Sequence, residues 1–192
     1  DHNCEWYIYG DIMSKLFVDE IKGNTGTSIT VPTTQKLIGT DVASIYAPGM
    51  IIQTVYNNQC NAQTTNSTSL VDTGLTINIT PKFQNSVFII HSSQNFYVTE
   101  EPGTDAQAQF VIQRVISGGS TTQIKSVVVG DHTGNGTRST SWGENNFTVY
   151  DSPNTTSQLT YKTQYKVYSS GWSAGVQTSS QCSHIIVHEV KQ

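Results

Sequence analysis

Few titratable side chains of this chain stand close enough in sequence to do acid–base chemistry. Asp131 and His132 form an adjacent acid–histidine pair within a glycine- and asparagine-rich stretch, residues 130–136, which we expect to be an exposed turn. An enzyme needs titratable groups within reach of one another. The motifs G-x-S-x-G, H-E-x-x-H and the Walker loop are absent from the sequence. The sequence therefore predicts a protein that is not an enzyme.

Two further histidines, His184 and His188, stand four residues apart in a stretch with the alternation of a β-strand. They share one face of that strand, about 13 Å apart at a rise of about 3.3 Å per residue. A single metal ion cannot bridge that distance, because zinc lies about 2 Å from its nitrogen ligands. The sequence contains neither His-x-His nor C-x-x-C. We predict no metal site and no cofactor, and we expect these histidines to be packed or interfacial.

Arg114 is the charged member of an otherwise apolar strand face, which carries Ala108, Phe110, Ile112 and Ile116. A buried guanidinium without a partner is very costly. We therefore expect Arg114 to form an ion pair, either at the rim of the fold or between subunits, and we name it as a candidate subunit-interface residue. Ligand binding by Arg114 is the alternative.

Aromatic side chains offer another kind of chemistry, because a ring face can pack against the C–H groups of a sugar. Trp142, Trp172 and Tyr150 are candidates for such a platform. Trp142 is the best exposed of them, because we expect residues 139–143 to be a loop. Together with His132 and Arg138, Trp142 is predicted to contact a receptor.

The three cysteines, Cys4, Cys60 and Cys182, are widely spaced. An odd number at such spacing makes neither a disulfide framework nor a zinc site. We expect buried free thiols, with a Cys60–Cys182 bridge as the alternative.

The elements that must position these residues are β-strands. Leu75, Ile77 and Ile79 alternate with polar residues until Pro81, and the same alternation runs through residues 159–169. Further strands are predicted at 49–56, 86–91, 95–99, 107–117, 123–129, 146–151, 173–178 and 182–190. Many short strands between turn sequences predict an all-β fold, an antiparallel β-sandwich of jelly-roll type, over residues 49–192.

Residues 1–48 have a different character and are predicted to be an extended anchoring segment. Short apolar fragments are separated here by Gly, Asn, Thr and Pro, and they bury too little surface to offset the entropy of ordering. We expect this segment to order against partners, through the apolar residues Leu16, Phe17, Val18, Ile21, Ile29, Val31, Leu37 and Ile38. Met13 resembles a translation start, which leaves three readings of residues 1–12: an upstream extension, a remnant of processing, or a remnant of cloning.

Composition narrows the choice of partners. The net charge is −4 and 12% of residues are charged, which excludes the basic field that attracts nucleic acid or anionic lipid. No apolar run approaches the length of about 20 residues that a membrane helix needs. Ser, Thr, Asn and Gln make up 75 of the 192 residues, a composition common on extracellular and virion surfaces, where salt screens charge.

Several stretches resemble one protein family. Residues 13–22 (MSKLFVDEIK), 28–32 (SITVP), 36–41 (KLIGTD), 47–55 (APGMIIQTV), 70–83 (LVDTGLTINITPKF), 112–114 (IQR), 151–157 (DSPNTTS) and 185–190 (IIVHEV) resemble short virion structural proteins of tailed phages, especially marine and cyanobacterial ones. The resemblance implies a trimeric fibre or spike subunit, anchored through its N-terminal segment to capsid or tail proteins. It implies a head on the virion surface that aids host attachment, in a protein made in the host cytoplasm.

Two other functions remain open on the sequence. The chain could be a capsid decoration protein whose first segment clamps neighbouring shell subunits, or a carbohydrate-binding module. In each case the partners are the chain itself, other virion proteins, or a glycan or protein of the host surface. Neither nucleic acid nor membrane insertion is expected.

Overall fold

The computed structural model of the chain describes residues 45–102, 105–131 and 140–192, together with the single positions 31, 33, 36 and 38. Ten β-strands and no helix occur among these residues. The strands are β1 (Ile51–Gln59), β2 (Gln63–Thr65), β3 (Val71–Ile79), β4 (Val87–Thr99), β5 (Ala106–Ile116), β6 (Thr121–Asp131), β7 (Thr140–Asp151), β8 (Leu159–Val167), β9 (Ser173–Val176) and β10 (Ser183–Val190). Contacts divide the chain into residues 1–38 and residues 39–192, and every strand belongs to the second unit.

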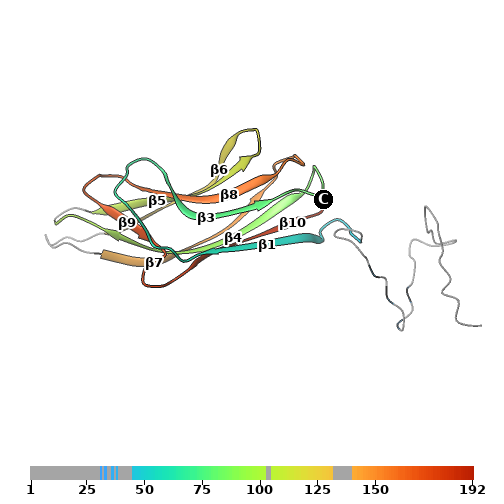
Figure 1. Ribbon diagram of the computed structural model, residues 1–192, viewed down its shortest axis with the longest axis horizontal. Coiled ribbons are helices and arrows are strands. Elements are labelled where there is room, and N and C mark those ends of the chain that lie inside the picture. Colours follow the sequence, from blue (N-terminus) through green and yellow to red (C-terminus); the bar gives the residue numbers. More distant parts are fainter. Residues whose placement is uncertain are drawn as a thin grey trace, which may run out of the picture. The chain divides into compact units, whose positions relative to one another are not determined.

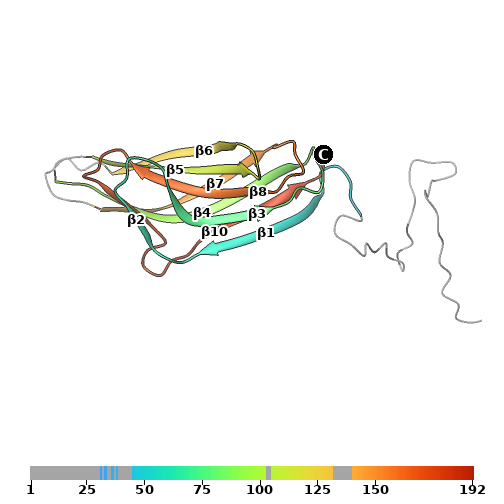
Figure 2. The same ribbon diagram turned by 45° about the horizontal axis from the view of Figure 1, so that its top comes forward.

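The strands form two antiparallel sheets that pack face to face (Figures 1 and 2). One sheet has the order β3-β8-β5-β6. In the other sheet, β1 pairs with β10, and β10 pairs with the first half of β4. The end of β4 pairs on the same edge with β9, which in turn pairs with β2. The opposite edge of β4 pairs with β7. The first long strand thus pairs with the last, and strands from both halves of the chain interleave in each sheet, as in a jelly roll. The predicted fold class, an all-β antiparallel sandwich, is confirmed.

The alternation seen in the sequence decides which side chains fill the space between the sheets. In β3, Leu75, Ile77 and Ile79 are buried while their neighbours are exposed, as the pattern predicts. In β8, Tyr161 and Tyr165 lie on the inner face and are almost fully buried. Side chains of this size supply most of the apolar area that a sandwich removes from water.

Three differences from the predicted strand boundaries stand out. The two strands predicted at 86–91 and 95–99 are joined in the single strand β4, Val87–Thr99, of 13 residues. β7 begins at Thr140, before the predicted start, and the short strand β2 was not predicted. The polar run in the middle of β4 suggested a break, but Gln94 is buried there and its side-chain amide donates to Thr163 Oγ1 at 3.4 Å. The strand continues through these polar residues because β7 pairs with β4 without a break from Phe88 to Thr99.

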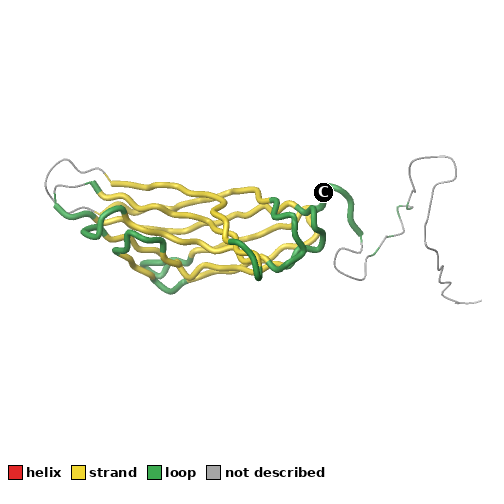
Figure 3. The backbone as a smooth tube through the Cα atoms, turned by 90° about the horizontal axis from the view of Figure 1, so that it is seen from above, coloured by secondary structure: helices red, strands yellow, loops and turns green. Residues whose placement is uncertain are grey.

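One end of the sandwich, which we call the base, is where residues 45–50 enter it. Ala47–Met50 form a turn with Gly49 at φ 85°, a conformation that favours glycine. The Gly49 amide donates to the Lys191 carbonyl at 2.7 Å, so the C-terminus lies beside the start of β1 (Figure 3). The Tyr46 ring packs 4.8 Å from the Phe83 ring. These contacts hold residues 46–49 against the base.

Candidate binding cleft

A cleft of about 780 Å³ opens on the outward side of the sheet that contains β4 and β7. Asn95, Trp142 and Glu144 occupy outward positions of these strands, while the lining residues Phe96 and Gly143 occupy the inward positions between them. The cleft lies far from the base, since Val87 pairs with Val190 at the base while Tyr97, ten residues further along β4, pairs with Trp142. At about 3.3 Å per residue this is a separation of about 33 Å. The described lining residues are Asn95, Phe96, Trp142, Gly143, Glu144, Gln181 and Cys182.

Trp142 is the exposed aromatic residue among the described lining residues of the cleft. It lies within β7, so the prediction of a loop at residues 139–143 is wrong for positions 140–143. Its side chain is 61% exposed, and its ring centroid lies 5.1 Å from that of Tyr97, its cross-strand partner. A strand position backed by a second ring holds the indole in place better than a loop would. Tyr97 was missed by the sequence reasoning, because only the pairing of β4 with β7 reveals it.

Amide and carboxylate groups surround the indole. Asn95 Nδ2 donates to Gln181 Oε1 at 2.9 Å, while Asn95 Oδ1 is buried without a hydrogen-bond partner. Glu144 pairs with Asn95 across the two strands and accepts a hydrogen bond from Ser93 Oγ. The cleft therefore combines one exposed aromatic face with several hydrogen-bond donors and acceptors.

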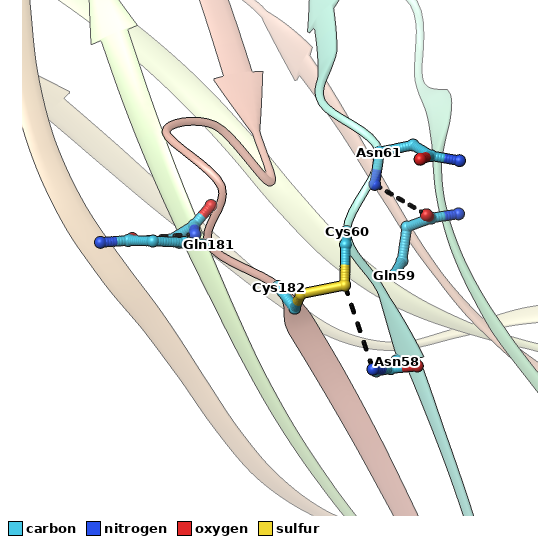
Figure 4. The surroundings of a disulfide bond; sticks show 7 residues. Asn58, Gln59, Cys60, Asn61, Gln181 and Cys182 are labelled. Carbon is cyan, nitrogen blue, oxygen red and sulfur yellow. Dashed lines mark hydrogen bonds between the residues drawn. A yellow bond between two sulfur atoms is a disulfide. The ribbon is translucent and has the colours of Figure 1, made fainter.

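A disulfide holds one wall of the cleft. Cys60 and Cys182 are bonded, with Cα atoms 4.1 Å apart (Figure 4). The expectation of buried free thiols is thus wrong for this pair, and both residues are exposed. The register of the sheet explains the bond. Gln59 of β1 pairs with Ser183 of β10, and the two strands are antiparallel. Cys60, which follows Gln59, therefore lies beside Cys182, which precedes Ser183. In Figure 4, Gln181 and Cys182 lie next to each other just before β10.

The connection that leads to Gln181 and Cys182 has an unusual backbone. Gln177, Ser179 and Ser180, in the connection from β9 to β10, have φ values of 53°, 56° and 61°. Residues other than glycine adopt this left-handed region at a cost of about 1–2 kcal/mol each. The connection is therefore held in its conformation by its surroundings, and the bond at Cys182 fixes one of its ends.

The three aromatic residues proposed as a platform do not gather. Tyr150 is 70% exposed on the outer side of β7, but it pairs with Ile89 near the base, eight residues from Trp142. Trp172 is half-buried and packs against the core. The platform prediction is therefore wrong for Trp172 and Tyr150.

Arg114 joins the two sheets. It lies on β5, and its Nη1 donates to Asp151 Oδ1 on β7 at 2.6 Å, with side-chain exposures of 12% and 7%. Tyr161 on β8 donates to the other carboxylate oxygen at 2.8 Å. Burial raises the pKa of Tyr161 far above its usual value, and the negative charge of Asp151 raises it further. The expected ion pair of Arg114 is found within one chain; a role at a subunit interface stays a prediction.

The remaining candidate residues lie mostly outside the described part of the chain. These are His132 and Arg138, and Leu16, Phe17, Val18, Ile21, Ile29 and Leu37 of the first segment. Val31 and Ile38 are described and are 44% and 73% exposed. Their part in anchoring stays a prediction.

The histidines of β10 share one face of the sheet, as predicted. His188 lies with its ring centroid 5.7 Å from that of His91 on β4. Among the described residues, no group of three or more His, Cys, Asp or Glu side chains is arranged to hold a metal ion. Within the same part of the chain, no helix is long and apolar enough to cross a membrane.

Comparison with known proteins gives weak likenesses only. No known protein family matches the sequence, and no curated protein does. Among solved structures, a D431N mutant of the VP2 protein of infectious bursal disease virus, in T=1 particles, is 12% identical over 81% of this chain, with a TM-score of 0.38. The T13 particle of the same virus is 12% identical over 82% of this chain, with a TM-score of 0.37. The structure of its Gt strain is 13% identical over 82% of this chain, with a TM-score of 0.28. The alignments cover 40% to 43% of those chains. At these values they assign neither a family nor a function.

Proposed function

We propose that the chain is a virion structural protein whose sandwich faces outward and aids attachment to the host. The observation that carries the proposal is the separation of the base from the cleft. Residues 45–50 enter at the base, and the cleft beside Trp142 lies about 33 Å away along β4. A subunit held on a particle through the segment before residue 49 presents the cleft away from the particle.

The surface chemistry supports an extracellular setting. Disulfides persist in oxidising surroundings and are rare in the cytosol. A subunit made in the reducing host cytoplasm would close the Cys60–Cys182 bond after release, when the two exposed thiols are oxidised by dissolved dioxygen, which takes up their two electrons and two protons. Solubility that depends on neutral polar groups rather than charge also suits a particle surface.

The finer assignment follows the sequence resemblance. The protein is a fibre or spike subunit of a tailed phage, it forms a homotrimer, and its first 48 residues bind other virion proteins. It binds rather than catalyses: Glu144 is the carboxylate among the described lining residues of the cleft, whereas glycoside hydrolysis ordinarily uses two. Its net charge of −4 gives it no affinity for nucleic acid.

Surface labelling of intact particles tests the proposal. Purified virions are treated with a membrane-impermeant amine reagent, and the labelled lysines are identified by mass spectrometry. Lys125, Lys162 and Lys166 lie in strands of the sandwich and are expected to be labelled. Absence of the protein from purified particles, or labelling only after the particles are disrupted, contradicts the proposal. Immunogold labelling spread over the whole shell would show a decoration protein instead of a tail fibre.

A further inference from the structure

We propose that the cleft beside Trp142 is a glycan-binding site that takes neutral pyranose sugars. The inference deepens the proposed attachment role and rests on it for its biological setting. Its chemical grounds are independent of that role, because they are the side chains and backbone of the cleft itself.

The indole supplies the apolar surface. The Trp142 side chain is 61% exposed, an arrangement that leaves a large ring in water unless something covers it. A pyranose ring with its C–H groups on one side makes a flat apolar face of similar size. Covering the indole with this face removes apolar area from water on both partners. Tyr97, 5.1 Å away, holds the indole in position before the sugar arrives.

The polar lining matches hydroxyl groups. A sugar hydroxyl both donates and accepts hydrogen bonds, so it can satisfy an amide or a carboxylate equally well. Asn95 Oδ1 is buried beside the cleft without a partner, and a buried acceptor left unpaired costs about 1–3 kcal/mol. Gln181 uses its Oε1 to accept from Asn95 and keeps its Nε2 group to donate. A sugar hydroxyl in the cleft can accept from the Gln181 side-chain amide, whereas it reaches the buried Asn95 Oδ1 only when the Asn95 side chain turns toward the cleft.

Charge selects against acidic sugars. Glu144 is the ionisable side chain among the described lining residues, and the whole chain carries a net charge of −4. A sialic or uronic acid would bring a second carboxylate next to Glu144, with no arginine or lysine in the described lining to pair with it. Neutral hexoses and N-acetylhexosamines avoid this repulsion and keep the hydroxyl contacts.

The wall is organised in advance. Gln177, Ser179 and Ser180 hold left-handed backbone conformations, and Cys182 ties the end of their connection to β1 through Cys60. Backbone strain of this kind concentrates at binding sites. A fixed wall lowers the entropy that the protein loses on binding. The cleft volume of about 780 Å³ has room for more than one sugar ring.

Titration calorimetry with the full chain tests the inference. The probes are tetrasaccharides of β-1,4-linked glucose and of β-1,4-linked N-acetylglucosamine, with tetragalacturonate as the acidic comparison. We expect saturable binding of at least one neutral probe, at least tenfold tighter than the acidic one. The indole emission should shift to shorter wavelength as the sugar covers Trp142. No binding of either neutral probe, or tighter binding of tetragalacturonate, overturns the inference.

Two matched variants locate the site. Trp142→Ala should weaken binding at least tenfold, because it removes the stacking surface. Tyr150→Ala is the control: Tyr150 is also on the outer side of β7 and 70% exposed, but it lies near the base. It should leave the affinity unchanged. Equal affinities of the wild type and Trp142→Ala overturn the inference.

The two proposals can fail separately. If the chain binds neutral glycans at Trp142 and surface labelling does not find it on particles, the virion assignment fails and the glycan site stands. If labelling finds the sandwich on particles and neither neutral probe binds, the glycan site fails and the virion assignment stands.

Discussion

Removal of the disulfide should destabilise the sandwich substantially. The bond joins residues that are 122 positions apart in the chain. In the chain-entropy description, closing a loop of this length lowers the entropy of the unfolded state enough to contribute about 5 kcal/mol at 25 °C. Measured contributions often fall below this value, because unfolded chains keep some structure. We therefore expect the double variant Cys60→Ser/Cys182→Ser to lose about 3–5 kcal/mol, a large share of the 5–15 kcal/mol typical of a domain.

Urea denaturation followed by fluorescence measures this loss. For a domain of this size the dependence on urea is about 2 kcal/mol per molar, so the midpoint should fall by about 2 M. Wild-type protein treated with a reducing agent should show the same midpoint as the double variant. The reductant should leave the variant unchanged, which controls for effects elsewhere in the chain.

A thiol titration supports the interpretation. Of the three cysteines in the chain, the bond uses two, so denatured, unreduced protein should show at most one reactive thiol per chain. Three thiols per chain in oxidised protein, or a midpoint that does not move in the double variant, would refute the reasoning. Retained stability with loss of glycan affinity would instead show that the bond holds only the wall of the cleft.

Other predictions concern the core and the floor of the cleft. Arg114→Ala leaves the carboxylate of Asp151 buried and without its cation, and it should cost about 3 kcal/mol in urea denaturation; a loss below about 1 kcal/mol would contradict the role of this pair in joining the sheets. Tyr161 and Tyr165 have raised pKa values because they are buried, so their contribution to stability is complete below the ordinary tyrosine pKa of about 10 and is lost as the pH rises above it. Absorbance at 295 nm should therefore show two tyrosines per chain ionising only when the protein unfolds, and early ionisation of all of them would show that the core is open. Gly175→Ala places a Cβ 2.2 Å from a ring atom of the neighbouring β4 tyrosine; we expect a loss of about 1–3 kcal/mol and weaker glycan binding, and unchanged values of both would be inconsistent with the close packing under Trp142.

The alternation of side chains was enough to predict the fold class. The inner faces of β3 and β8 were assigned correctly from sequence, because a one-residue shift would have moved Leu75 or Tyr161 to the solvent. The length of β4 could not be predicted in the same way. Its polar centre continues as strand because β7, a segment distant in the chain, pairs with it from Phe88 to Thr99.

The cleft was only partly predictable. Trp142 was singled out as an exposed aromatic, which is correct, but for the wrong reason, since it lies in a strand. Its neighbours Tyr97 and Asn95 come from β4 and Gln181 from the connection before β10, and no spacing in the sequence links these segments. The Cys60–Cys182 bond likewise depends on the pairing of β1 with β10. Both features depend on the order of the strands in the sheet, which the sequence analysis did not establish.

A three-dimensional map of the intact particle from electron cryomicroscopy tests the central claim most directly. We predict density for the sandwich projecting from the particle, with residues 49–51 and the C-terminus toward the particle and Trp142 at the outer end. Because the base and the cleft lie far apart along β4, a map distinguishes a sandwich with the cleft outward from one with the cleft inward. A sandwich with the cleft turned inward, buried under other proteins, or absent from the particle would contradict the account.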